Sequence, residues 1–160
     1  MSKIAVVYWS GTGNTESMAS AVVEGARKAG AEATLIAASE FGASMMDEYD
    51  AIAFGCPSMG TEQLEESEFE PMFTGCETKL RGKRIALFGS YGWGDGEWIG
   101  KTLAARMEPF SLAIVSFARR HQMMMRSMLV RSLAPHWFDR GFFFIRLSMA
   151  LTSLGMKALR

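Results

Sequence analysis

A short segment rich in glycines and hydroxyl-bearing side chains stands near the start of the chain: Ser10, Gly11, Thr12, Gly13, Asn14 and Thr15. An apolar run precedes it and an apolar stripe with helical spacing follows it, so the segment joins a buried strand to a helix. Backbone N–H groups at a helix N-terminus lack intrahelical partners and attract anions. The segment therefore predicts an anion site, with an ordinary helix N-cap as the alternative.

The residue types in this segment narrow the class of anion. No Gly-Lys-Ser/Thr follows, which excludes the loop that binds nucleoside triphosphates. Glu16 stands where the dinucleotide-binding fingerprint requires its third glycine. Hydrogen-bonding side chains without a cation remain, and they suit a single terminal phosphate group.

A second segment combines glycine with side chains suited to a flat ring: Ser58, Met59, Gly60, Thr61 and Glu62. The glycine lets the backbone approach a ligand closely, and the polarizable Met59 side chain packs well against a ring face. Glu62 can accept a hydrogen bond from a ring N–H. The alternative is a plain turn with Met59 in the core and Glu62 in solvent.

A third segment places aromatic residues among glycines: Ser90, Tyr91, Gly92, Trp93 and Gly94. Glycine costs conformational entropy, so three glycines at 92, 94 and 96 favour a sharply bent loop that presents Tyr91 or Trp93 for stacking. A tryptophan buried in the core is the competing interpretation.

Apolar runs that alternate with helical patterns predict the elements that position these segments. Strands are expected over residues 3–9, 32–36, 51–55, 84–89 and 112–117. Helical segments are expected over residues 18–29, 45–49, 68–80 and 98–107. This alternation predicts an α/β fold with a doubly wound parallel sheet, whose ligand lies beyond the carboxyl ends of the strands.

The three segments, in this order and spacing, resemble those of short-chain flavodoxins of the clostridial type, and the run from Leu64 to Pro71 is similar too. The resemblance covers about residues 1–117. It implies the flavodoxin-like fold with strand order 2-1-3-4-5 and noncovalently bound flavin mononucleotide (FMN). Thr61 departs from the pattern, because the clostridial type often has an acidic residue there.

The resemblance also implies roles for individual residues. The cofactor contacts would be Ser10, Gly11, Thr12, Gly13, Asn14, Thr15, Ser58, Met59, Gly60, Thr61, Glu62, Ser90, Tyr91, Gly92, Trp93 and Gly94. Met59 and Trp93 would flank the flavin ring, and the Gly60 peptide would turn over on reduction to face the flavin N5–H. The first segment would hold the phosphate, and Glu62 would accept from the ring N3–H.

The function implied is that of a low-potential one-electron carrier between cytoplasmic redox enzymes, with no catalytic residues of its own. Acidic side chains would surround the cofactor edge and attract basic redox partner proteins in transient complexes: Glu62, Glu65, Glu66, Glu68, Glu70 and Asp95. A solvated acidic face is the alternative interpretation of these residues. The alternative functions are an FMN-dependent quinone reductase and a degenerate domain that no longer binds flavin.

Composition sets further limits. The 160 residues, 49% hydrophobic and 21% charged, fit one globular domain, and we expect a monomer. Cys56 and Cys76 lack metal-site spacing, and His121 and His136 have no cysteine near them, so no metal site is expected. No signal peptide is recognised, which favours the cytoplasm, and no motif indicates nucleic-acid binding.

The charge divides the chain into two unlike parts. Residues 1–108 contain 9 lysines and arginines against 16 acidic residues, a net charge of −7, whereas residues 109–160 contain 8 against 1, a net charge of +7. We therefore expect an FMN-binding domain over residues 1–117 and an atypical basic tail, rich in Met and Phe, over residues 118–160.

Three interpretations of the tail remain open. It forms basic amphipathic helices that contact a membrane surface or an acidic partner, it replaces the last helix of the fold, or it stems from an altered reading frame. We favour the third. A membrane-spanning helix is not expected, because residues 141–156 include Arg146 and are fewer than the ~20 apolar residues that a span requires.

Overall fold

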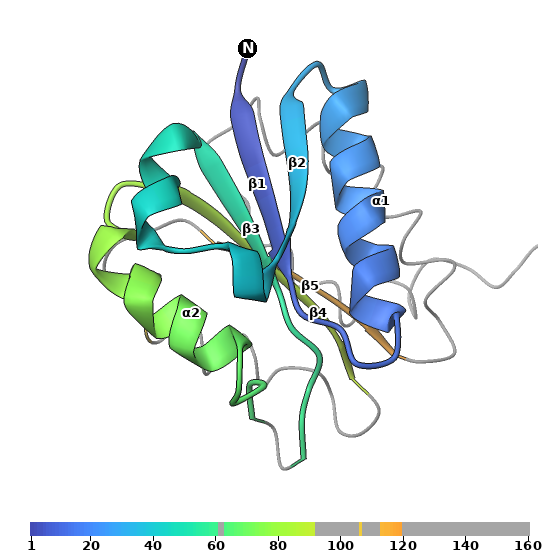
Figure 1. Cartoon of the computed structure of the whole chain (residues 1–160). Coiled ribbons are helices and arrows are strands. Elements are labelled where there is room, and N and C mark those ends of the chain that lie inside the picture. The colour runs from blue at the N-terminus through green and yellow to red at the C-terminus, as the bar shows by residue number, and fades with distance from the viewer. Residues whose placement is uncertain (61–62, 92–105, 107–112, 120–160) are drawn as a thin grey trace, which may run out of the picture.

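A parallel five-stranded sheet forms the centre of the molecule (Figure 1). The computed structural model describes residues 1–60, 63–91, 106 and 113–119, the last range by its backbone. The strands are β1 (Lys3–Tyr8), β2 (Glu32–Ala37), β3 (Ala51–Gly55), β4 (Arg84–Tyr91) and β5 (Ala113–Arg119). Their order is β2-β1-β3-β4-β5, which confirms the predicted fold class and strand order.

The register aligns the carboxyl ends of the central strands. Tyr8 of β1 lies opposite Gly55 of β3, and Gly55 lies opposite Phe88 of β4. Because all pairs are parallel, the loops that follow β1, β3 and β4 leave the sheet at the same edge. This edge collects the three segments that the sequence singles out.

Alternating side chains send the two faces of the sheet into separate cores. Ile4 and Val6 pack with α1 (Asn14–Lys28), while Ala5 and Val7 pack in the cluster that contains α2 (Phe69–Cys76). Figure 1 shows α1 on one side of the sheet and α2 on the other. The four central side chains of β1, residues 4–7, are fully buried because both faces of the strand are covered, as its continuous apolar run predicts.

The helical predictions that fall within the described residues are correct in place and differ at the ends. α1 stops at Lys28, and Gly30, with a φ of 85°, ends the turn as expected. The predicted helix over 68–80 is α2 followed by a 3-10 turn, Glu77–Lys79, with Pro71 in the first turn of α2. Two more 3-10 turns, Ala38–Glu40 and Ala43–Glu48, precede β3 where one helical turn was expected over 45–49.

Strand β4 extends two residues further than predicted. Ser90 and Tyr91 pair with Ala118 and Arg119 of β5, so they continue the strand. The predicted helix over 98–107 and the tail over 118–160 lie outside the described residues, apart from Arg106 and the last residues of β5. Within the described part of the chain, no helix has the length and apolar character needed to cross a bilayer.

Candidate functional site

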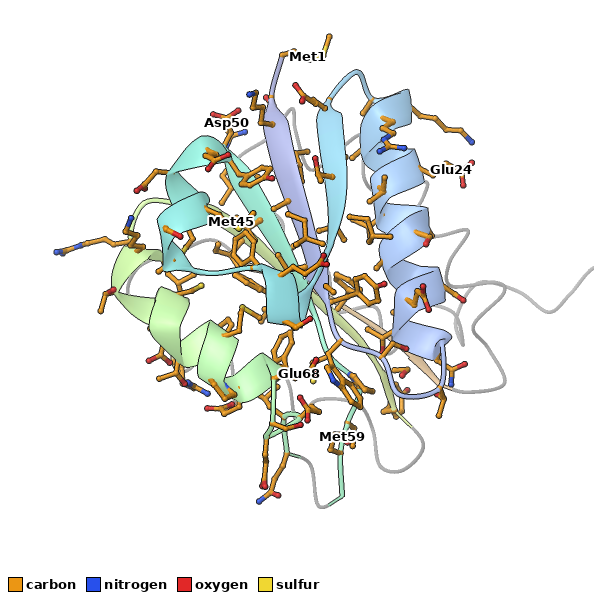
Figure 2. The ribbon with its side chains drawn as sticks, in the orientation of Figure 1. Met1, Glu24, Met45, Asp50, Met59 and Glu68 are labelled. Atoms are coloured by element: carbon orange, nitrogen blue, oxygen red, sulfur yellow. The ribbon has the colours of Figure 1, made fainter. Side chains whose placement is uncertain are left out.

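Backbone hydrogen bonds join the loops at the carboxyl end of the sheet. Trp9 N–H donates to Gly55 O at 2.9 Å, which links the loop after β1 to the end of β3. Ser58 N–H donates to Ser90 O at 2.8 Å, which links the loop after β3 to the end of β4. Met59 lies at this end of the molecule in Figure 2, far from Met1 and Asp50 at the amino end. The structure therefore brings together those parts of the three predicted segments that it describes.

The first segment fits a phosphate group. The hydroxyl oxygen of Ser10 is buried and has no hydrogen-bond partner among the described residues, although buried polar atoms are nearly always paired. Gly13 is the N-cap of α1, with a φ of 82°, and no side chain caps the helix. A buried donor without a partner and an uncapped helix start are what an anion seated at this loop would satisfy.

The indole of Trp9 packs against the backbone of this loop at Gly11. A Cβ added at Gly11 would lie 2.9 Å from the Trp9 ring, so the loop backbone packs closely over the indole. Trp9 in turn packs against the core cluster beneath α2. Trp9 was not among the predicted site residues, and the signal for it in the sequence is an aromatic residue directly before a glycine-rich turn.

The second segment forms a small loop around Gly60. Met59 and Gln63 exchange two backbone hydrogen bonds of 2.9 Å, and Gly60 has a φ of 50°, a conformation that favours glycine. The Met59 side chain is 37% exposed, as an apolar side chain that covers a ligand would be. Thr61 and Glu62 lie outside the described residues.

The base of this loop is fixed by Glu65, and the prediction that this residue belongs to an acidic surface is wrong. Its side chain points inward, and the residue is only 6% exposed. One carboxylate oxygen accepts from the Ser67 N–H and hydroxyl, and the other accepts from the N–H groups of Glu68 and Phe69 at 2.9 and 3.0 Å. Glu65 therefore caps the start of α2.

The environment of Glu65 keeps it ionised. Burial raises the pKa of the carboxyl, but the hydrogen bonds from Ser67, Phe69 and Glu68 outweigh it and lower the pKa to about 2. The Glu65 N–H also lies 3.5 Å from the Cys56 sulfur at the end of β3. Glu65 thus connects the start of α2, through its carboxylate, with the end of β3, through its N–H, and these two elements flank the second segment.

The third segment begins inside the sheet. Ser90 and Tyr91 are buried, and Tyr91 is 8% exposed, so Tyr91 is not presented for stacking and that role stays a prediction for Trp93. The cause is the longer pairing of β4 with β5. The Ser90 hydroxyl lies 3.2 Å from the hydroxyl of Thr15 in the first turn of α1. Gly92, Trp93 and Gly94 lie outside the described residues.

Two further acidic residues are engaged by Arg106. Its guanidinium contacts Glu70 and Glu77, each at 2.6 Å, and lies 5.2 Å from the centre of the Phe73 ring. Glu66 and Glu68 are the exposed members of the predicted acidic group within the described residues. Figure 2 places Glu68 at the same end of the molecule as Met59.

Neither cysteine is suited to redox chemistry or metal binding. Cys56 and Cys76 are free and buried, and burial raises the pKa of the Cys56 thiol to about 12. Among the described residues, no group of three or more His, Cys, Asp or Glu side chains could bind a metal ion.

Comparison with known proteins agrees with this geometry. The family model described as Flavodoxin matches residues 6–133. A flavodoxin of Clostridium beijerinckii is 44% identical over 110 residues, which cover 69% of this chain and 79% of that protein. A flavodoxin of Megasphaera elsdenii is 47% identical over 96 residues, which cover 60% of this chain and 70% of that protein.

A solved structure extends the agreement to three dimensions. The solution structure of two-electron reduced Megasphaera elsdenii flavodoxin aligns with a TM-score of 0.72 at 38% identity, over 84% of this chain and 97% of that one. Flavodoxins bind FMN and transfer electrons, and they are not enzymes. The matched sequence, the strand order and the phosphate-fitting loop together show that the chain belongs to the flavodoxin family.

Proposed function

We propose that this chain is a low-potential one-electron carrier whose FMN is bound by the three loops at the carboxyl end of the sheet. When bound, FMN supplies the one-electron chemistry, and the protein tunes its potential. The observation that carries the proposal is the buried Ser10 hydroxyl at the uncapped start of α1, which finds no partner within the part of the chain that the structure describes. A phosphate there would accept hydrogen bonds from the loop.

Two features of the second loop support a role in tuning the potential. Gly60 lies at a φ of 50°, where its peptide can turn over without the strain that a side chain would add. The exposed carboxylate of Glu68 places negative charge at the same end of the molecule as Met59 (Figure 2), and Glu66, two positions earlier in the chain, is exposed too. Negative charge near the cofactor disfavours further negative charge upon reduction, which lowers the potential.

The acidic end also suggests how partners are found. Flavodoxins transfer electrons to redox partner proteins. In this chain Glu66 and Glu68 would attract a basic partner to the end where the cofactor edge lies, in a weak and short-lived complex of the monomer. We place this exchange in the cytoplasm and assign FMN binding to residues 1–117, with 118–160 as a separate tail.

Titration of the purified apoprotein with FMN, followed by flavin fluorescence, tests the proposal. The matched control is the same domain with residues 118–160 exchanged for the corresponding segment of a clostridial-type flavodoxin. We expect strong quenching at a stoichiometry of one FMN per chain. Absence of quenching in both proteins would contradict the proposal, and quenching in the control alone would locate the fault in the tail.

A further inference from the structure

The buried hydroxyls of Thr15 and Ser90 connect the first turn of α1 with the end of β4, next to two of the three proposed cofactor loops. They lie 3.2 Å apart although 75 positions separate them in the chain. Thr15 is fully buried and Ser90 nearly so, and no other side-chain hydrogen bond of either hydroxyl is seen among the described residues. Each hydroxyl has one proton to donate, so the direction of this hydrogen bond decides what Thr15 can offer to a ligand.

The backbone around Ser90 is fixed from both sides. Ser90 pairs with Ala118 of β5 on one side, and on the other its carbonyl oxygen accepts from Ser58 N–H at 2.8 Å. Its hydroxyl is therefore presented from a rigid strand rather than from a mobile loop. Thr15, by contrast, stands in the first turn of α1, as the last residue of the segment in which the Ser10 hydroxyl finds no partner among the described residues.

We propose that Ser90 is a positioning residue that acts on the phosphate through Thr15, by donating its hydroxyl proton to Thr15 Oγ1. This inference rests on the proposed function. If Ser90 donates, the Thr15 proton is left free to point toward the loop, where an anion would accept it. A hydroxyl that accepts one hydrogen bond also donates a stronger one. The hydroxyl of Ser90 then contributes to phosphate affinity without touching FMN itself.

The alternative that the family resemblance implies is direct contact of Ser90 with the flavin or its ribityl chain. The two roles differ in one measurable respect. An effect that passes through Thr15 requires the phosphate, so it is present with FMN and absent with riboflavin. A direct contact to the ring or ribityl chain affects both ligands equally.

The experiment compares the dissociation constants of FMN and riboflavin for the full-length apoproteins of the wild type, Ser90→Ala, Thr15→Val and the double variant. We expect Ser90→Ala to raise the constant for FMN about tenfold and to leave that for riboflavin unchanged. Thr15→Val should act in the same way. The double variant should bind FMN no more weakly than Thr15→Val alone, because both changes remove the same hydrogen bond.

Ser20→Ala, an exposed serine on α1, is the matched control and should leave both constants unchanged. The free energy of unfolding of each apoprotein separates a binding effect from a loss of folding. Three outcomes would each overturn the inference. Ser90→Ala could weaken the binding of FMN and riboflavin equally, or it could leave the dissociation constant for FMN unchanged. In the third outcome, the losses in FMN affinity from the two single variants would add up in the double variant. Failure of the wild type to bind FMN would overturn the proposed function as well.

Discussion

Gly55 shows how tightly a single position limits the sequence. It ends β3, and a Cβ added there would overlap the ring of Phe88 on the neighbouring strand. Phe88 is itself buried in the cluster beneath α1, so its ring has little room to move. The loop that begins one residue later carries Met59 and Gly60, so the close contact lies directly beside that loop.

Gly55→Ala should therefore lower the free energy of unfolding by about 3 kcal/mol through overpacking. Denaturant unfolding of the apoprotein measures the change. Gly75→Ala is the matched control, because Gly75 lies in α2 with no atom near its added Cβ and should gain about 0.5 kcal/mol. A loss at Gly75 equal to that at Gly55 would contradict the packing argument.

At the scale of elements, the joint between β3 and α2 depends on Glu65. Its carboxylate accepts hydrogen bonds from Ser67, Glu68 and Phe69. Glu65→Gln keeps the size of the side chain but places an amide N–H₂ where an acceptor is needed. We expect the free energy of unfolding to fall by about 2 kcal/mol at neutral pH.

The pH dependence of this effect has a definite sign. The pKa of Glu65 is about 2 in the folded chain against an ordinary value of 4.5, so its stabilising contribution is complete above pH 4.5 and is lost as the pH falls toward 2. The stability difference between the wild type and Glu65→Gln should shrink over that range. Urea unfolding at a series of pH values measures it, and a difference that stays constant would contradict the role of the ionised carboxylate.

The same elements show what a sequence can reveal. The strands were predictable because parallel strands buried on both faces are marked by continuous apolar runs such as residues 3–8. The end of β4 could not be predicted, because Tyr91 continues the strand by pairing with Arg119, which lies 28 positions later in the chain. Glu65 stands in an acidic run that resembles a solvated face, and only the folded chain shows the helix start that it caps.

For the site, the glycines were the informative residues. Gly13 and Gly60 have positive φ, and their presence at fixed distances after predicted strands was enough to locate two loops. The contact between Thr15 and Ser90 could not be predicted, because it depends on how α1 sits on the end of β4. Residue types therefore predicted the class of ligand, whereas the connections between the loops required the structure.

At the scale of the whole molecule, negative charge at the carboxyl end of the sheet should govern the rate at which the protein associates with its redox partners. For the FMN-loaded protein, we expect the second-order rate of electron transfer to a basic haem protein to fall about tenfold between about 10 mM and 300 mM salt. Stopped-flow absorbance measures the rate. Replacing Glu66 and Glu68 by Gln should weaken this dependence on salt.

Glu32 and Glu48 provide the matched control for that experiment. Both are exposed, and they lie at the start of β2 and just before β3, at the opposite end of the sheet. Replacing both by Gln removes the same net charge as the change at Glu66 and Glu68. If the two double variants lost the same share of the salt dependence, net charge rather than the acidic end would be responsible.

The parallel sheet also has a consequence for synthesis of the chain on the ribosome. β4 borders β3 on one side and β5 on the other, but 21 residues separate the end of β4 from the start of β5. Until Ala113–Arg119 emerges from the exit tunnel, the outer edge of β4 exposes unpaired N–H and C=O groups next to apolar side chains. The nascent chain then passes through a stage at which that edge can pair with another chain, so a pause in translation between the emergence of β4 and the emergence of β5 would favour aggregation.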